Sequence, residues 1–213
     1  MVARHRTTAR NVEDAELPHC AEERYGMAMP EMARKWTREM VLALPDDGNR
    51  YELFDGELLV TPSPTMPHQH AVALLWSAIA PYVTEHRLGI TMSSPADLHL
   101  GGEQLSQPDL FVLPELPADR RWSAAPNPVL VIEVLSPSSA RADRLVKRRR
   151  FQRAGIPEYW IVDLDAQVAE RWRPDDERPE ILDQRVVWHP AGALEPLVIE
   201  LPSLFREVCG TES

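Results

Sequence analysis

The chain has 213 residues, of which 44% are hydrophobic and 26% are charged, and its formal net charge is −10. This length fits a single domain with a sizeable core. The acidic balance argues against a general nucleic-acid coat protein and against a membrane-surface protein, because both classes usually carry excess basic charge. Residues 141–153 reverse that balance locally: they hold seven basic residues and one acidic residue, so the rest of the chain carries −16.

The two cysteines, Cys20 and Cys209, lie near opposite ends of the chain and form no C-x-x-C pair. Two isolated cysteines are typical of a reducing compartment without a disulfide framework. The N-terminal segment has no secretory hydrophobic region, and the longest apolar run, residues 71–83, is too short to span a bilayer. We therefore expect a cytoplasmic protein with no membrane partner. Residues 1–30 lack apolar periodicity and predict a disordered extension before one domain over residues 31–208.

Short helices and strands alternate through the first half of the chain. Thr37 is the predicted cap of a helix over residues 38–44, and an Asp55-Gly56 pair predicts the turn of a hairpin. Apolar residues at three- and four-residue intervals predict a long helix over residues 68–87. The predicted strands of this half are residues 51–54, 57–61, 90–92 and 96–100.

The second half begins with a predicted strand at residues 109–113. A continuous apolar run at residues 129–134 predicts a strand that is buried on both faces. A helix is expected from the serine-rich segment 136–139 to about Ala154, ended by Gly155. Further strands are predicted at residues 158–163, 168–172, 186–188 and 197–200, of which the last three indicate an antiparallel set.

Two carboxylates interrupt the apolar strands. Glu133 comes at the end of the 129–134 run, where a carboxylate is costly to bury unless it is paired, hydrogen-bonded or bound to metal. Asp109 opens the preceding strand directly after Pro108. Each acid also has a plainer interpretation, a solvent-exposed strand end for Glu133 and a turn residue for Asp109. Glu57, after the Asp-Gly turn, either assists this pair or is an ordinary hairpin glutamate.

A lysine is expected on the inward side of the following helix. At about 100° per residue, positions 140, 143, 147, 151 and 154 share one stripe, which carries the small and aromatic side chains. Lys147 lies on this stripe and needs a partner. It either forms a salt bridge with Asp143, one turn earlier, or directs its ammonium group at the carboxylate pair. In the second position it would stabilise negative charge or orient an attacking water.

Two carboxylates with Mg²⁺ or Mn²⁺ are the usual groups for phosphodiester hydrolysis, because the ion takes oxygen ligands and neutralises phosphate charge. DNA is the expected partner, and a homodimer is a further expected assembly. His68 and Asp143 are candidate supporting residues behind the metal ligands. The arginines on the outer side of the helix either form a solvated face or contact DNA phosphates; they are Arg141, Arg148, Arg149, Arg150 and Arg153.

As a set, these motifs resemble the PD-(D/E)XK nuclease superfamily and, more narrowly, the Uma-two (Uma2) family of bacterial endonucleases. The matching stretches, within residues 36–205, are Tyr51–Glu57, Gln107–Asp109, Val131–Ser138, Asp143-Arg144 with Lys147, and Ala154–Asp163. The resemblance implies a restriction-endonuclease-like α/β core, with a central mixed sheet flanked by helices and extra antiparallel strands. It also implies Asp109 and Glu133 as metal ligands. The superfamily pattern has a lysine two residues after the second acid, where this chain has Leu135, so the resemblance implies that Lys147 serves from the following helix.

The sequence therefore predicts a metal-dependent DNA endonuclease. Asp109 and Glu133 hold the ion, Lys147 stabilises charge or positions water, and Glu57 assists. The alternative is a non-catalytic nucleic-acid-binding or assembly module that kept the fold, and a third possibility is a metal-dependent hydrolase acting on something other than DNA. Metal titration separates the first two, because a catalytic protein binds Mg²⁺ or Mn²⁺ weakly and loses that binding with Asp109→Asn.

Overall fold

The structure is a computed structural model that describes residues 35–210. The predicted extension, residues 1–30, lies outside the described residues. The helices and strands are, in chain order, α1 (Arg38–Leu42), β1 (Arg50–Phe54), β2 (Glu57–Thr61), α2 (Met66–Glu85), β3 (Ile90–Ser93), β4 (Leu110–Leu113), the 3₁₀ turn η1 (Trp122–Ala124), β5 (Leu130–Val134), α3 (Ala140–Ala142), the π-helical turn η2 (Asp143–Lys147), α4 (Arg148–Arg153), β6 (Glu158–Asp163), β7 (Val168–Trp172), β8 (Glu180–Leu182), β9 (Arg185–Trp188), β10 (Leu197–Glu200) and α5 (Leu201–Cys209).

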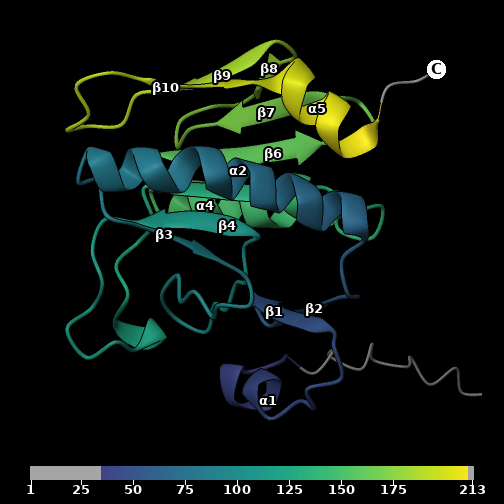
Figure 1. Cartoon of the computed structure of the whole chain (residues 1–213). Coiled ribbons are helices and arrows are strands. Elements are labelled where there is room, and N and C mark those ends of the chain that lie inside the picture. The colour runs from purple at the N-terminus through teal and green to yellow at the C-terminus, as the bar shows by residue number, and fades with distance from the viewer. Residues whose placement is uncertain (1–34, 211–213) are drawn as a thin grey trace, which may run out of the picture. The chain divides into compact units, whose positions relative to one another are not determined.

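Six strands form the central sheet, in the order β3-β4-β5-β6-β7-β8 (Figure 1). The β5–β6 pair is parallel, and the other four pairs are antiparallel. Parallel neighbours need a crossover between them, and α3, η2 and α4 supply it. The expected mixed sheet flanked by helices is therefore confirmed.

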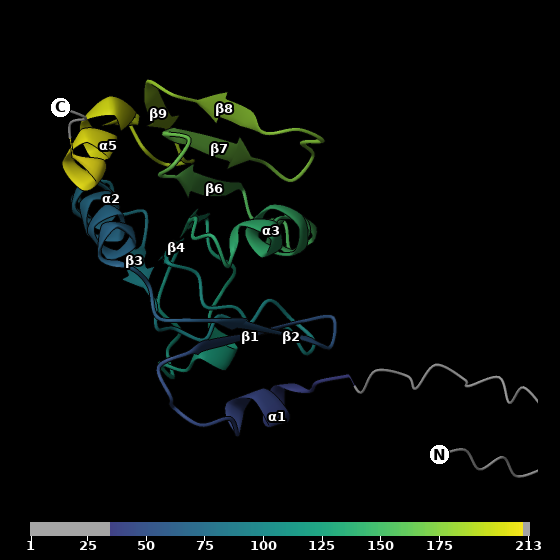
Figure 2. The ribbon, with the colours of Figure 1, turned by 90° about the vertical axis from the view of Figure 1, so that its right-hand side faces the viewer.

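Helices cover both faces of this sheet (Figures 1 and 2). On one face, α2 and α5 pack on a core that contains Leu110, Ile132 and Trp160. On the other face, the crossover packs through Phe151 on a core that contains Val131. Val131 and Ile132 are neighbours in β5, and they enter different cores because successive side chains of a strand point to opposite faces. All five residues of β5 are buried, as the continuous apolar run predicts.

The β1–β2 hairpin forms a separate two-stranded sheet that docks beside the central one. Asp55 and Gly56 have φ values of 56° and 85°, which is the backbone that a two-residue type I′ turn requires. The predicted Asp-Gly turn is confirmed. β1 then pairs with the segment before β4, because Leu53 and Leu105 exchange backbone hydrogen bonds of 2.8 and 3.0 Å. This contact places β1 beside the start of β4.

Three expectations about the strands and the crossover helix are wrong. Residues 96–100 form no strand and contribute an isolated bridge between Leu98 and Ser106. β7 does not belong to a terminal set, because it pairs with β6 and β8 while β9 and β10 form a separate ribbon. The crossover is not one continuous α-helix, since η2 interrupts it.

Three elements, the 3₁₀ turn η1, β8 and α5, have no counterpart in the sequence prediction. β8 is a mostly exposed three-residue strand, and α5 begins at Leu201-Pro202, where proline occupies the first turn. No helix within residues 35–210 combines the length and the apolar character that crossing a bilayer requires.

Phe151→Ala is expected to lower the free energy of unfolding by about 3–5 kcal/mol, because it leaves a cavity beneath α4. Phe151 has no exposed surface. Urea denaturation followed by circular dichroism measures the loss. The control is Val187→Ala on the exposed side of β9, which should change stability by less than about 0.5 kcal/mol. Similar losses in both variants would contradict the packing described for the crossover.

Candidate active site

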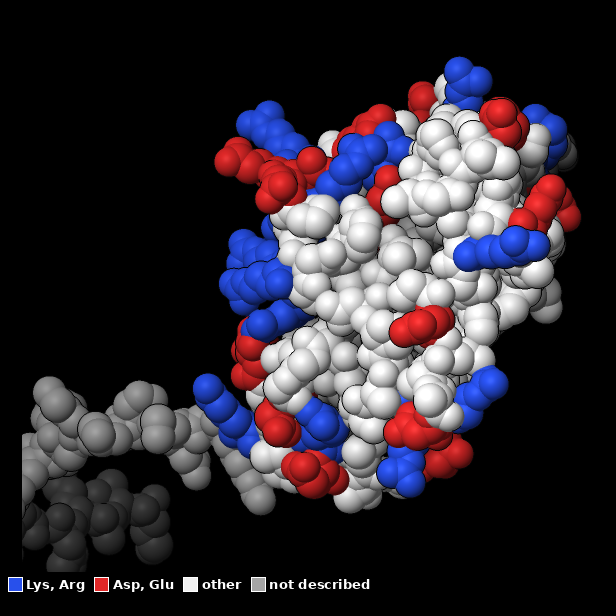
Figure 3. Space-filling model, turned by 90° about the vertical axis from the view of Figure 1, so that its left-hand side faces the viewer, with Lys and Arg blue, Asp and Glu red and all other residues white. Residues whose placement is uncertain are grey.

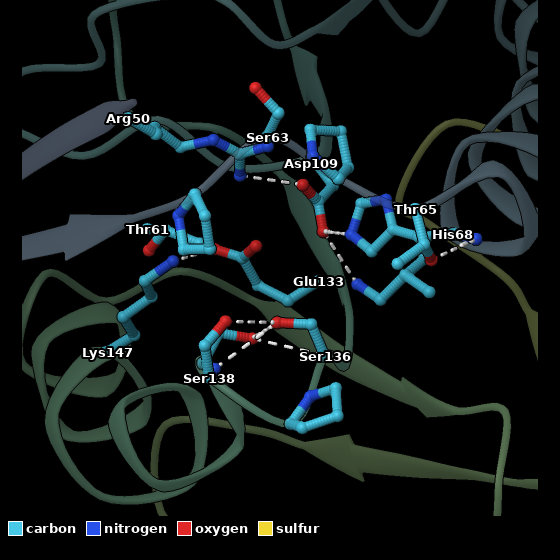
Figure 4. A pocket seen from close by; sticks show the side chains of 15 residues that line it. Arg50, Thr61, Ser63, Thr65, His68, Asp109, Glu133, Ser136, Ser138 and Lys147 are labelled. Carbon is cyan, nitrogen blue, oxygen red and sulfur yellow. Dashed lines mark hydrogen bonds and ion pairs between the residues drawn. The ribbon is translucent and has the colours of Figure 1, made fainter. Parts of the chain in front are cut away.

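Asp109 and Glu133 face the same space from neighbouring strands (Figure 4). β4 and β5 are antiparallel with Leu110 opposite Ile132, so Asp109, one residue before β4, lies opposite Glu133. Directly opposed residues share a sheet face, with Cβ atoms about 4.5–5.5 Å apart. Both side chains are buried, and both line one cavity of about 180 Å³. The structure thus brings together the two acids that the sequence singled out.

The carboxylate of Asp109 already has three hydrogen-bond donors. Its Oδ1 accepts from Arg50 Nη1 at 2.7 Å, and its Oδ2 lies 3.0 Å from His68 Nε2 and 2.8 Å from the Val134 backbone nitrogen. Burial opposes ionisation, but the hydrogen bond to His68 and the charge of Arg50 hold the pKa of Asp109 well below its usual range. Asp109 is therefore a fixed anion, and His68 is a residue that orients it.

Lys147 lies at the centre of a buried charge cluster. Its Nζ is 2.7 Å from Glu52 Oε2, 2.9 Å from Glu133 Oε1 and 3.1 Å from Asp143 Oδ1. The contact with Glu133 is aligned as a hydrogen bond, and the other two are ion pairs at contact distance. Burial disfavours the ammonium form, but the three carboxylates raise the pKa of Lys147 well above its usual value. Lys147 thus contacts both Asp143, on its own helix, and Glu133, an acid of the site. The sequence had left these two partners as alternatives.

The π-helical turn η2 sets the direction of Lys147. The backbone N–H of Arg148 donates to the carbonyl of Asp143, five residues earlier, and the Tyr159 hydroxyl donates to the same carbonyl at 3.2 Å. Such wide turns are rare and frequently occur at functional sites. Asp143 and Lys147, at the two ends of this turn, are both buried. The turn therefore delivers one acid and one cation to the cluster.

Glu133 presents one oxygen to the cavity. Its Oε1 accepts from Lys147, and no hydrogen-bond donor to Oε2 is found within the described part of the chain. Burial and the negative charge of Asp109 raise the pKa of Glu133 well above its usual value, despite the opposing effect of Lys147. Burial is the largest cause of this shift, and the charge of Lys147 alone does not offset it.

The sequence prediction missed Glu52 and chose Glu57 instead. Glu57 is exposed at the start of β2, and it does not line the cavity. Glu52 is fully buried on β1, where Ser106 Oγ and the Gln107 backbone nitrogen donate to its Oε1 at 2.9 and 2.8 Å. The available signal was the one used for Glu133: Glu52 is an acid inside an otherwise apolar strand. The third acid near the site is therefore Glu52.

The charge of this cluster fits a divalent cation. With all carboxylates ionised, four negative and two positive side chains leave a net charge of −2; they are Glu52, Asp109, Glu133 and Asp143 with Arg50 and Lys147. Uncompensated buried charge is costly. Within residues 35–210, no three His, Cys, Asp or Glu side chains converge on a complete metal site. The two acids that line the cavity, Asp109 and Glu133, supply oxygen ligands of the kind that Mg²⁺ takes, which are commonly one or two carboxylates together with waters and substrate phosphate.

A family model described as "Uma2: Putative restriction endonuclease" matches residues 38–202. The chain belongs to the Uma2 family. Its fold is similar to the crystal structure of "a putative nuclease belonging to DUF820 from Anabaena variabilis ATCC 29413", with a TM-score of 0.62 and 22% sequence identity. That similarity covers 81% of this chain and 98% of the other. The curated proteins contain no match to the chain. The family and the shared fold together support a nuclease.

In this Uma2 protein, two of the arginines expected to point outward are engaged internally. The Arg148 guanidinium lies 4.4 Å from the centre of the Trp172 ring, and it also hydrogen-bonds Gln152. Arg150 forms an ion pair with Asp55 in the β1–β2 turn. Both therefore stabilise the packing of α4. Arg141, Arg149 and Arg153 are exposed, as expected.

Lys147→Met is expected to lower the free energy of unfolding by about 3–5 kcal/mol at neutral pH, because it leaves three buried carboxylates without their cation. Thermal or urea unfolding of the metal-free protein measures the change. Lys35, the only other lysine of the chain, is exposed, and Lys35→Met should cost less than about 0.5 kcal/mol. A stable Lys147→Met protein would show that the cluster does not depend on this charge.

Proposed function

We propose that this Uma2 protein is a metal-dependent DNA endonuclease that hydrolyses phosphodiester bonds. The observation that carries the proposal is the directly opposed pair Asp109 and Glu133, which lines a cavity inside a cluster of four acidic and two basic side chains. Structural ion pairs alone do not require such an excess of negative charge in a buried place. The Uma2 membership and the nuclease fold agree with this chemistry.

Asp109 and Glu133 are the proposed ligands of the ion. When bound, Mg²⁺ or Mn²⁺ would neutralise phosphate charge and lower the pKa of water at the site. Lys147 holds Glu133 by one oxygen, so that the other oxygen faces the cavity. His68 and the backbone of Val134 fix the carboxylate of Asp109. Glu52 and Asp143 hold Lys147 in place rather than contacting substrate.

DNA is the proposed substrate, and its contacts must reach beyond the cavity. The loops at the cavity mouth, residues 61–65 and 136–139, contain threonine, serine and proline and no charged residue. The side of the protein turned away from the N-terminal end of α2 is mostly uncharged, apart from acidic atoms near its centre, and most of its charged residues lie around the edge (Figure 3). Arg141 and Arg149, exposed on the crossover, are the proposed phosphate contacts, and a homodimer is the proposed assembly.

Mn²⁺-dependent nicking of plasmid DNA is the activity that tests this function. Asp109→Asn and Glu133→Gln are each expected to reduce the rate by at least about 100-fold, because each removes a charged ligand for the ion. Circular dichroism should show a folded protein in both cases. Single-stranded DNA and RNA assayed in parallel identify the polymer that is cleaved. Full activity in Asp109→Asn would exclude the proposed site.

Glu52 and Glu57 give a matched pair of acids, five residues apart. Glu52→Gln is expected to slow cleavage by about tenfold or more, because it weakens the clamp on Lys147 and thereby the position of Glu133. Glu57→Gln should stay within about twofold of the parent rate, because its side chain is exposed outside the cavity. The reverse order of effects would restore Glu57 as the assisting acid.

Metal binding separates a nuclease from a non-catalytic module on the same fold. At about 100 times the dissociation constant, Mn²⁺ should stabilise the folded protein by about 2.7 kcal/mol. A rise in the unfolding temperature with Mn²⁺ detects this effect, and EDTA should reverse it. Asp109→Asn should abolish the rise. A protein that binds DNA but shows no metal-dependent stabilisation would support the non-catalytic module.

A further inference from the structure

The site contains two cations, and their surroundings differ sharply. Lys147 is held by three carboxylates, and its side chain is 2% exposed. Arg50, the first residue of β1, is 15% exposed and lies against both the site cavity and a neighbouring cavity of about 250 Å³. Lys147 cannot leave without exposing buried charge, whereas Arg50 has open space beside it.

Arg50 uses one of its nitrogens in the described contacts. Nη1 donates to Asp109 Oδ1 at 2.7 Å and to the Gln107 carbonyl at 3.1 Å. A guanidinium has five N–H donors in a planar fork. Among residues 35–210, no acceptor hydrogen-bonds the Nε or Nη2 atoms of Arg50. Most of its capacity to bind an anion is therefore available beside the cavity.

The Arg50 contact falls on the oxygen that a metal ion would need. Asp109 Oδ2 is engaged by His68 and by the Val134 backbone, so Oδ1 is the less occupied oxygen of the carboxylate. A divalent ion at Oδ1 would stand a few ångströms from the guanidinium, and like charges at that distance repel strongly in a buried site. The ion and the present position of Arg50 compete for the same carboxylate.

We propose that Arg50 is the resting counter-ion of Asp109, and that metal binding releases it to hold the phosphate of the substrate. This inference rests on the proposed function and adds a residue to it. In the metal-free protein, Arg50 neutralises Asp109 and keeps the buried carboxylate charge tolerable. In the metal-loaded protein, its free fork binds the phosphodiester at the cavity mouth, a group that guanidinium recognises through paired hydrogen bonds.

The charge balance supports this exchange. When all four carboxylates are ionised, the six side chains of the cluster carry −2, and a divalent ion brings the site to zero. A phosphodiester then adds one negative charge. Arg50 is the only cation of the cluster that is not enclosed by carboxylates, and it is therefore the one that can turn towards that charge. The hydroxyl of Thr61, at the same mouth, offers a further hydrogen bond.

Chemical labelling of Arg50 tests its release directly. Phenylglyoxal modification, followed by peptide mass spectrometry, is expected to increase at Arg50 when Mn²⁺ is added to the full-length protein. A short phosphorothioate oligonucleotide that resists cleavage should then reduce the modification again. Arg185, which is exposed on β9 and lines neither cavity beside Arg50, serves as the reference site and should not respond to either addition. Unchanged or reduced labelling of Arg50 with Mn²⁺ would overturn the inference.

Calorimetry with the Arg50→Gln variant supplies the second arm. This variant should bind Mn²⁺ about tenfold more tightly than the parent, because a unit positive charge next to the ion is removed. Its metal-loaded form should bind the phosphorothioate oligonucleotide about tenfold more weakly, and Arg50→Lys should restore only part of that binding. Arg185→Gln is the matched control, with both affinities unchanged. Weaker Mn²⁺ binding in Arg50→Gln would mean that Arg50 builds the metal site.

The outcomes separate this inference from the function on which it rests. If the parent protein binds no Mn²⁺ and cleaves no DNA, the proposed function fails and the inference fails with it. If the parent binds Mn²⁺ and cleaves DNA while Arg50 labelling does not rise, only the release of Arg50 is refuted.

Discussion

The ion cluster around Lys147 is the constraint on which the site depends. It joins three separate parts of the fold, since Glu52 comes from β1, Glu133 from β5 and Asp143 from η2. Ammonium and carboxylate groups without exposure are tolerated only while they are paired. The hairpin, the sheet and the crossover must therefore meet in one arrangement. The same pairing fixes the orientation of Glu133, so the cluster that holds the fold together also prepares the site.

A second consequence concerns which groups can respond to a ligand. The cations and anions nearest the core are locked by several partners, whereas the residues at the mouth are uncharged or, like Arg50, held on one side. An incoming ion or phosphate would meet fixed acidic side chains at the base of the cavity and less constrained side chains at its mouth. Preorganised charge of this kind favours catalysis because little reorganisation is needed when the substrate is bound.

The sequence predicted the parts of the site that follow from local pattern. The apolar run around Glu133, the strand that begins at Asp109 and the family resemblance singled out the two acids, and helical spacing was sufficient to turn Lys147 inward. Glu52 required knowledge of where the hairpin docks, which depends on the backbone contact between Leu53 and Leu105 rather than on local pattern. Arg148 was expected on the outer side of the helix, either solvated or in contact with DNA phosphates. Instead it lies against Trp172 from β7, a residue 24 positions away in sequence.

The π-helical turn η2 also sets the rotational position of α4 about its own axis. An α-helix advances by about 100° per residue, so the one extra residue in η2 rotates the whole of α4 relative to α3. In the phase that results, Phe151 is buried and Arg149 is exposed. A change of length within these five residues would therefore disturb both the buried ion cluster and the packing of α4, whereas a change of length in an exposed loop would disturb neither.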